Sequence, residues 1–94
     1  MKQPAVYIMA SQKLGTLYVG VTSNVRQRVG QHKNGAYDGF TRQYHVHRLV
    51  HLELFVSMKE AIAREKRLKE WKRAWKILLI EETNPDWRDL TDQL

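Results

Sequence analysis

The chain has 94 residues, of which 43% are hydrophobic and 28% are charged, a balance typical of a folded globular protein rather than a disordered one. It contains no cysteine, which excludes disulfide bonds and thiolate metal ligands. Sixteen lysine and arginine residues against ten acidic residues give a formal net charge of +6. Such a charge favours polyanionic partners, nucleic acid among them, through the release of counterions.

Neither a membrane span nor a secretory leader is expected. No stretch reaches the ~20 apolar residues that cross a bilayer, and the apolar run at residues 5–10 is too short for a leader with its cleavage site. We therefore expect a cytoplasmic protein. A chain of this length rarely divides into two cores, so residues 1–94 are predicted to form one domain.

Two short runs of strand-forming residues, 5–10 and 16–21, open the chain. A polar turn that includes a glycine joins them, which predicts an antiparallel hairpin. If its register is symmetric about the middle of the turn, Tyr7 and Tyr18 lie on the same face of the hairpin. Gly20 shares that face and is expected to leave open space beside Tyr18.

A helix is predicted to follow the hairpin, over Val25–Lys33. Ser23 or Asn24 can cap its first turn, because either side chain can accept a hydrogen bond from a backbone N–H of that turn. An Asn-Gly pair ends the helix. The residues that follow, 36–45, are predicted to form a loop.

The second half of the chain predicts one strand and two helices. Residues 46–56 are rich in valine, leucine and phenylalanine and are expected to form the third strand. Ser57 then caps a helix that runs to Glu70. A third helix, or a bent continuation, covers residues 71–82, and a proline soon afterwards ends it.

The order strand, strand, helix, strand, helix, helix predicts an α+β domain, with a small three-stranded antiparallel sheet flanked by three helices. The tail, residues 86–94, is expected to dock back on this body through Trp87 and Leu90. Burying two large apolar side chains would stabilise that arrangement.

One acidic residue interrupts the apolar face of the predicted second helix. A helical period places Glu65 in the middle of a stripe of apolar side chains. The stripe comprises Met58, Ala61, Ile62, Leu68 and, if the helix continues, Trp75. An inward carboxylate must be paired, protonated or bound to a metal ion, since leaving it bare costs several kcal/mol. The pattern alone favours a structural salt bridge with an arginine from another element.

The first predicted helix also carries charged or polar side chains next to its apolar face. Val25 and Val29 mark its apolar side, and Arg28 and His32 flank that side four residues apart. Both can therefore reach one point beyond the helix surface. For this helix alone, partial burial of the arginine stem is the simpler interpretation. The unusual feature is convergence, because two tyrosines, an arginine, a histidine and a glutamate are all expected to point towards the interior side of one small sheet.

These residues match a known pattern, and the chain resembles the GIY-YIG nuclease superfamily. The half-motifs appear as AVY at residues 5–7, with alanine for the usual glycine, and as YVG at residues 18–20. Arg28 follows the second half-motif by eight residues, where the family has its catalytic arginine. His32 comes four residues further on, where members carry histidine or tyrosine. Glu65 matches the family's metal-binding glutamate.

The resemblance extends over residues 5–84, nearly the whole chain, so we expect no separate DNA-targeting domain. The chain is similar to the nuclease domain of the bacterial excision-repair incision protein. It is more similar to short stand-alone bacterial members, which share REK at residues 64–66 and NPDW at residues 84–87. Apart from Ala5, the departure is at Val21-Thr22, where some relatives carry a lysine and this chain lacks that cation.

The resemblance implies an endonuclease that hydrolyses phosphodiester bonds of nucleic acid, DNA in the first place, with a single divalent ion, Mg²⁺ or Mn²⁺. Glu65 would bind the ion, and Arg28 would hold the scissile phosphate through its planar fork. Tyr7 is the candidate for activating the attacking water. Tyr18 and His32 would orient water or phosphate or relay a proton, and His32 is the alternative base. Repair or processing of unusual DNA is the implied role.

Several polar residues outside this constellation are candidates for contacts with the nucleic-acid backbone. A solvated helix face is the simpler interpretation for most of the basic ones. The amide among them matches a late asparagine of relatives. The candidates are Arg42, Lys66, Lys69, Lys72, Arg73 and Asn84.

Three other interpretations stay open. The chain could be a non-catalytic nucleic-acid-binding module on the same fold, although phosphate binding alone does not need an inward acid. It could be an interaction domain that uses its tryptophans, although Trp71 and Trp75, at i and i+4, are more typical of a core. His51 and Glu53 share a face of the third strand and could bind a metal, although packing and a surface pair are favoured. The sequence also leaves open whether a partner protein or a homodimer directs the chain to its substrate.

Overall fold

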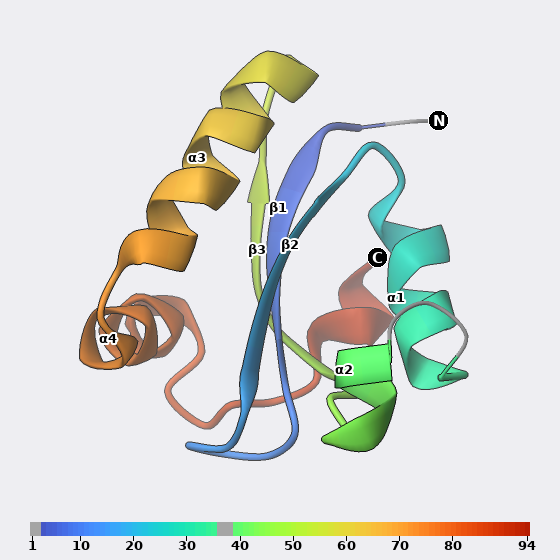
Figure 1. Ribbon diagram of the computed structural model, residues 1–94, viewed down its shortest axis with the longest axis vertical. Coiled ribbons are helices and arrows are strands. Elements are labelled where there is room, and N and C mark those ends of the chain that lie inside the picture. The colour runs from blue at the N-terminus through green and yellow to red at the C-terminus, as the bar shows by residue number, and fades with distance from the viewer. Residues whose placement is uncertain (1–2, 36–38) are drawn as a thin grey trace.

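The sheet has three antiparallel strands, β1 (Ala5–Ala10), β2 (Leu17–Thr22) and β3 (Arg48–Leu54), in the order β2-β1-β3 (Figure 1). The computed structural model describes residues 3–35 and 39–94. The central strand, β1, is buried along its whole length. The predicted α+β class with a small three-stranded antiparallel sheet is therefore confirmed.

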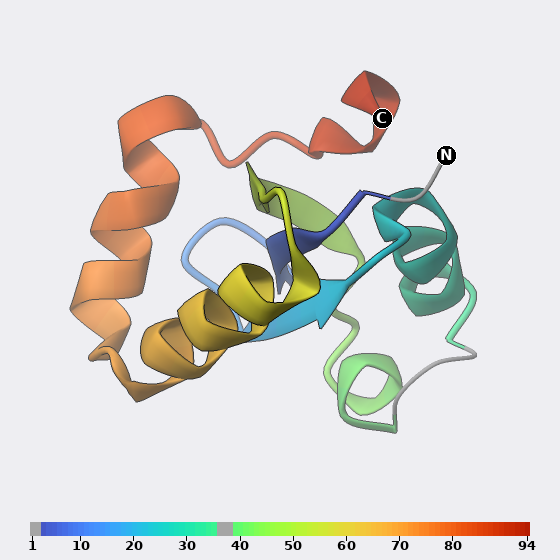
Figure 2. The ribbon, with the colours of Figure 1, turned by 90° about the horizontal axis from the view of Figure 1, so that it is seen from above.

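The helices are α1 (Val25–Lys33), α2 (Gly39–Gln43), α3 (Met58–Glu70), α4 (Arg73–Thr83) and the short 3-10 helix η1 (Leu90–Gln93). They cover both faces of the sheet: α3 and α4 lie on one side, and α1, α2 and η1 on the other (Figure 2). Among the described residues, no helix is both long and apolar enough to cross a bilayer.

The predicted first helix is confirmed in both of its bounds, and its cap is Asn24. The Asn24 side chain accepts a hydrogen bond from the backbone N–H of Gln27 at 3.2 Å. By contrast, α2 lies inside the segment predicted as a loop, residues 36–45, of which residues 36–38 lie outside the described residues. A five-residue helix makes too few turns to show a period in the sequence.

Each face of the sheet has its own apolar core. On one face Val6 and Ile8 of β1 pack with Leu68 of α3. On the other face Tyr7 packs with Val29 of α1. Because successive residues of β1 point to opposite faces and are all apolar, both faces must be covered for the strand to leave water.

The expected convergence of the candidate residues on one side of the sheet is wrong. The Tyr7 side chain packs on the face of the sheet that α1, the helix of His32, covers. Glu65 belongs to α3, which covers the opposite face (Figure 2). The pattern of a helix shows which of its faces is buried, but not which layer of the domain it joins.

A β-bulge interrupts β3 near the centre of the sheet. Ile8 of β1 pairs with His51, and the next residue, Met9, pairs with Leu49. Val50 is therefore an extra residue in β3. As a result, the His51 side chain lies on the same face as Ile8, towards α3.

A short extended link separates α3 from α4. Trp71 and Lys72 have ψ angles of 147° and 150°, so the helical stripe of α3 stops there. Trp75, expected on that stripe, is 51% exposed, and Leu78 one turn later is 64% exposed. The prediction that Trp75 belongs to the core is wrong, because the link rotates α4 relative to α3.

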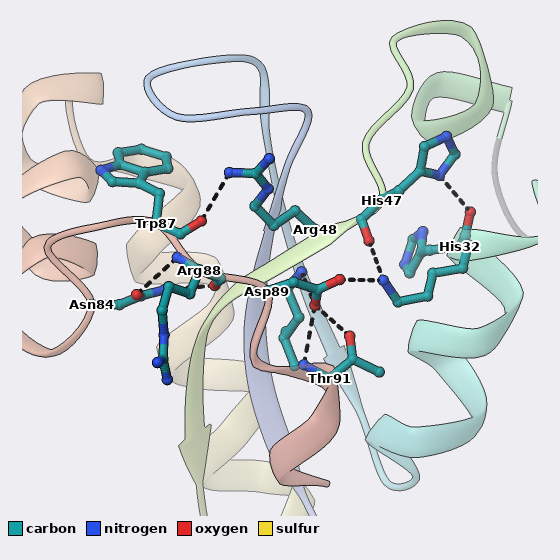
Figure 3. Close-up of polar contacts among 10 residues, drawn as sticks. His32, His47, Arg48, Asn84, Trp87, Arg88, Asp89 and Thr91 are labelled. Carbon is teal, nitrogen blue, oxygen red and sulfur yellow. Dashed lines mark hydrogen bonds and ion pairs between the residues drawn. The ribbon is translucent and has the colours of Figure 1, made fainter.

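The segment after α4 crosses to the α1 side of the sheet (Figures 2 and 3). Trp87 is fully buried in the core beneath α3, and Leu90 packs against the opposite core, which confirms the predicted docking of the tail. Arg48 Nη1 donates to the carbonyl oxygen of Trp87 at 3.0 Å. Lys33, at the end of α1, forms an ion pair with Asp89. The tail thus links α1 to β3.

Candidate active site

Tyr7 lies across the neighbouring strand. It pairs with Gly20 of β2, and a Cβ atom at position 20 would lie 2.4 Å from the Cζ and hydroxyl oxygen of the Tyr7 ring. The ring therefore rests directly on the glycine backbone, where any side chain would collide with it. The open space predicted beside Tyr18 is in fact filled by Tyr7.

The Tyr7 hydroxyl is hydrogen-bonded to a histidine of α1. The hydroxyl oxygen lies 2.8 Å from Nε2 of His32, and Nδ1 of the same ring lies 3.2 Å from Oγ1 of Thr41 on α2. All three residues are fully buried. An imidazole bonded through both nitrogens is fixed in orientation. The site is therefore built from β1, α1 and α2.

Aromatic rings continue from this hydrogen bond to the surface. The ring centroid of Tyr18 lies 6.3 Å from that of Tyr7 and 5.0 Å from that of His32, so the two tyrosines share a face as predicted. On the outer side, Phe40 of α2 lies 6.2 Å from Tyr18 and 4.8 Å from Tyr44. Phe40 and Tyr44 are 43% and 46% exposed, so the row of rings opens to solvent.

Arg28 lies one helical turn before His32 and on the same side of α1. The residue is half-buried, so part of it is covered by the fold while part can meet a ligand. A hydrogen bond and ring contacts thus bring Tyr7, Tyr18 and His32 together, and Arg28 joins them through its place on the helix. A guanidinium there offers paired donors for a phosphate.

Glu65 approaches from the other layer. α3 packs against β1 and β2, with Ala61 and Leu68 turned towards the sheet. Arg64 on one flank of α3 reaches Glu53 of β3 at 2.8 Å. Glu65 lies on the opposite flank of the helix. It therefore faces the side of β2, one of the two edge strands of the sheet.

The Glu65 side chain is 13% exposed and forms an ion pair of 2.7 Å with Lys69, one turn later in the same helix. The salt bridge suggested by the pattern thus exists, but its partner is a lysine of α3 and not an arginine from another element. No group of three or more metal-ligating side chains occurs within residues 3–35 and 39–94. One carboxylate fits Mg²⁺ or Mn²⁺ only as an ion that keeps much of its water and takes other oxygens from a phosphate. Lys69, 54% exposed, is free to swing away from such an ion.

His51 and Glu53 belong to an ion-pair network between β3 and α3. His51 Nε2 donates to Glu53 Oε2 at 2.8 Å, and Arg64 Nε donates to Glu53 Oε1 at 2.8 Å. Burial, the largest single influence, raises the pKa of Glu53, but the hydrogen bonds from His51 and Arg64 together outweigh it and lower this pKa to about 2. The favoured pairing of His51 with Glu53 is confirmed, with Arg64 as its third member.

The basic candidates for backbone contacts are all exposed: Arg42, Lys66, Lys69, Lys72 and Arg73. They are not equally available. Arg73 donates to two carbonyl oxygens of the β1–β2 turn, each at 2.7 Å, and so holds α4 against that turn. Lys69 is paired within α3. Arg42 stands on α2, in the same short helix as Thr41.

Asn84 has a structural role that contradicts its predicted contact with nucleic acid. It is 4% exposed. Its amide nitrogen donates to the carbonyl oxygen of Val50 at 3.2 Å. The same nitrogen donates to the carbonyl oxygen of Arg88 at 2.9 Å, and Oδ1 accepts from the Arg88 N–H at 3.0 Å (Figure 3). Both ends of the amide therefore serve to fix the turn after α4.

The motif spacing and this geometry agree with a comparison of the sequence with known families. The model of the GIY-YIG catalytic domain matches residues 3–78. The chain belongs to the GIY-YIG family. The five candidate residues of this GIY-YIG domain all fall inside the matched region: Tyr7, Tyr18, Arg28, His32 and Glu65. Membership of this nuclease family indicates nucleic acid as the substrate.

Short GIY-YIG relatives span nearly the same length. The chain is 38% identical over 88 residues to a UPF0213 protein of Syntrophus aciditrophicus, covering 92% of this chain and 98% of that protein. A UPF0213 protein of Halobacterium salinarum is 42% identical over 66 residues, which cover 70% of this chain and 86% of that one. The solution NMR structure of a UPF0213 protein from Bacillus halodurans matches with a TM-score of 0.58 at 30% identity, covering 96% and 95% of the two chains. The fold is thus shared with short stand-alone members of the family.

Sequence reasoning missed the role of Thr41 in α2. Thr41, which contacts His32, lies in a segment that shows no helical period, and a single threonine carries no signal by itself. Phe40 stands out in the sequence, together with Arg42, as a residue that could touch DNA or cap the sheet, and in the structure its ring lies against Tyr18.

Proposed function

We propose that this GIY-YIG protein is an endonuclease that hydrolyses phosphodiester bonds of DNA with one divalent ion, Mg²⁺ or Mn²⁺. The buried hydrogen bond of 2.8 Å between the Tyr7 hydroxyl and His32 carries this proposal. A phenol and an imidazole in direct contact can take a proton from water and hold it, which is the task of a general base. Repair or processing of unusual DNA structures is the role that we propose for this activity.

In this mechanism Tyr7 and His32 act together as the base. As a proton of the attacking water moves to the Tyr7 oxygen, the Tyr7 proton moves to Nε2 of His32. The hydroxide forms a bond to phosphorus, and the bond from phosphorus to the leaving oxygen breaks. The leaving oxygen takes a proton from solvent, and the proton on His32 returns to solvent through Tyr7. Tyr18, whose ring lies beside both, orients the water or the phosphate.

The second task of the site is to stabilise the negative charge that develops on the phosphate. Arg28 would donate two parallel hydrogen bonds to the scissile phosphate and offset the charge that develops in the transition state. Glu65 would hold the divalent ion together with water and a phosphate oxygen. When bound there, such an ion would supply positive charge that stabilises the leaving oxygen. Arg28 on α1 and Glu65 on α3 come from opposite layers, which suits a phosphate bound at the β2 edge between them.

The surface beside the site suits nucleic acid. Phe40 and Tyr44 present exposed rings next to Tyr18, and a base stacked on such a ring gains about 1–3 kcal/mol. Arg42 lies on the same helix, and the chain has a net charge of +6. These features support contacts to both bases and phosphates, in addition to those of the catalytic residues.

Two substitutions test the proposal. Glu65→Gln and Arg28→Ala should each reduce Mg²⁺-dependent cleavage by roughly 10²-fold or more, because each removes a group that offsets charge in the transition state. The measurement is cleavage of a panel of branched, nicked, single-stranded and duplex DNA. Circular dichroism and thermal unfolding serve as controls for folding. Full activity in both folded variants would refute the assignment.

The ion pair between Glu65 and Lys69 favours a second candidate, a non-catalytic nucleic-acid-binding module on the same fold. In that case Lys69 is a permanent partner of Glu65 and no ion replaces it. A plasmid-nicking assay with and without Mg²⁺ separates the two functions. Binding without nicking under any metal condition supports the module, whereas nicking that depends on Mg²⁺ and is lost in Glu65→Gln supports the nuclease.

A further inference from the structure

His32 has a partner at each ring nitrogen. Nε2 is bonded to the Tyr7 hydroxyl at 2.8 Å, and Nδ1 lies 3.2 Å from Oγ1 of Thr41. A neutral imidazole carries one proton, so one of its nitrogens donates while the other accepts. Which nitrogen carries the proton therefore decides whether His32 can receive a proton from Tyr7.

We propose that Thr41 is a positioning residue that selects the tautomer of His32 needed for proton transfer. Its hydroxyl oxygen accepts the Nδ1–H of His32, so that Nε2 keeps a lone pair directed at the Tyr7 hydroxyl. The inference rests on the proposed function in so far as Tyr7 and His32 form the base. It adds a residue of α2 that acts through His32 and not on the reacting water or phosphate itself.

The position of Thr41 supports this assignment. Thr41 is fully buried, whereas Phe40 and Arg42 on either side of it are exposed. A buried hydroxyl costs free energy unless it is hydrogen-bonded, so a valine of the same shape would suit a purely structural role better. The backbone carbonyl of Thr41 also accepts a hydrogen bond from the Val46 N–H at 2.8 Å. This bond connects Thr41 to the segment that leads into β3.

The same contact serves His32 after it has received a proton. The imidazolium donates from both nitrogens, to Tyr7 and to Thr41, and neither partner has to move. A threonine oxygen can accept in both states. Without it, the Nδ1–H would be buried without a partner, and His32 would favour the tautomer that donates from Nε2 to Tyr7. That tautomer has no lone pair for the Tyr7 proton.

The test compares Thr41→Val, which removes the hydroxyl at nearly constant shape, with Thr41→Ser, which keeps it. ¹⁵N NMR of the ring nitrogens, with His32 assigned through a His32→Gln variant, reports the tautomer in the protein without nucleic acid. We expect Nδ1–H in the wild type and in Thr41→Ser, and Nε2–H in Thr41→Val. An Nε2–H tautomer in the wild type, or an unchanged tautomer in folded Thr41→Val, would overturn the proposal.

Kinetics supply a second readout. Thr41→Val should lower kcat by about 10²-fold with little change in KM, because it affects proton transfer and not binding, and Thr41→Ser should restore it. Thr22→Val is the matched control. Thr22 is also a buried threonine, but its hydroxyl accepts from the Asn24 N–H at 3.0 Å and does not serve His32, so kcat should stay near the wild-type value. If the wild type cleaves nothing, the proposed nuclease fails, while the NMR result still decides the role of Thr41.

Discussion

Tyr7 and Gly20 act as one unit, although they stand on different strands. The phenol can reach His32 because position 20 has no side chain under its ring. The two half-motifs of the family are thereby connected physically: the tyrosine of the first needs the glycine of the second. Tyr18, in the second half-motif, makes an edge contact with the His32 ring, with centroids 5.0 Å apart.

Gly20→Ala should separate Tyr7 from His32. The new Cβ would lie 2.4 Å from the Tyr7 hydroxyl oxygen, so the ring must shift, and the substitution should lower the free energy of unfolding by about 1–3 kcal/mol. Cleavage should fall at least tenfold. Gly30→Ala in α1 is the matched control, since a Cβ there meets nothing within 4 Å and should stabilise the helix by about 0.5–1 kcal/mol. Equal stability and activity in both variants, measured by denaturant unfolding and cleavage, would show that Tyr7 does not need this space.

At the scale of elements, α3 is held to the sheet by a charged contact on the flank away from Glu65. Arg64 donates to both oxygens of Glu53, at 2.8 Å and 3.1 Å, and His51 donates to the same carboxylate. This network connects α3 to β3. It thereby fixes the rotation of α3 and the direction in which Glu65 points.

The network predicts a dependence of stability on pH. The pKa of Glu53 falls from 4.5 to about 2 on folding, because the hydrogen bonds from His51 and Arg64 outweigh the opposing effect of burial. A lowered pKa means that the contribution is fully present above about pH 4.5 and is lost as the pH falls to about 2. Glu53→Gln should therefore cost about 1–3 kcal/mol at neutral pH. Denaturant unfolding of the two proteins should give free energies that approach each other between these pH values. Glu82→Gln, at an exposed position, is the control, and a difference for Glu53→Gln that is constant with pH would contradict the role of the network.

For the molecule as a whole, the basic side chains lie in both layers. Arg42 stands on α2, on one side of the sheet, and Lys66 and Lys69 stand on α3, on the other. Nucleic acid at the β2 edge could therefore contact cations from both sides. Arg42→Ala should weaken binding and reduce the slope of log K against log salt by about 1. The measurement is fluorescence anisotropy over a series of salt concentrations. Arg26→Ala, an exposed arginine on α1, should keep the slope, and equal slopes for both variants would place Arg42 outside the interface.

Local signals in the sequence predicted some elements to the residue. β1 has the expected bounds because a continuous apolar run ends at a polar turn, and α1 has them because its N-cap Asn24 and the Asn-Gly stop directly flank it in the sequence. The members of the site were also recognisable, since Arg28 and Glu65 break apolar patterns. Their arrangement was not, because the layer to which α3 belongs depends on packing across the sheet. Thr41 was missed because a five-residue helix has no period and its contact with His32 is made in three dimensions only.

The bulge at Val50 shifts the pairing register of β3 by one residue. Past this one residue, every side chain of the strand changes the face on which it would otherwise lie. With regular pairing, His51 would stand opposite Tyr7, and the carboxylate of Glu53 would lie on the face that carries Tyr7 and Tyr18. The extra residue places both on the side of α3, where Arg64 and His51 donate hydrogen bonds to the Glu53 carboxylate. The chain thus separates the acid that connects β3 to α3 from the face of the proposed catalytic tyrosines, and it does so by register, with no change in composition.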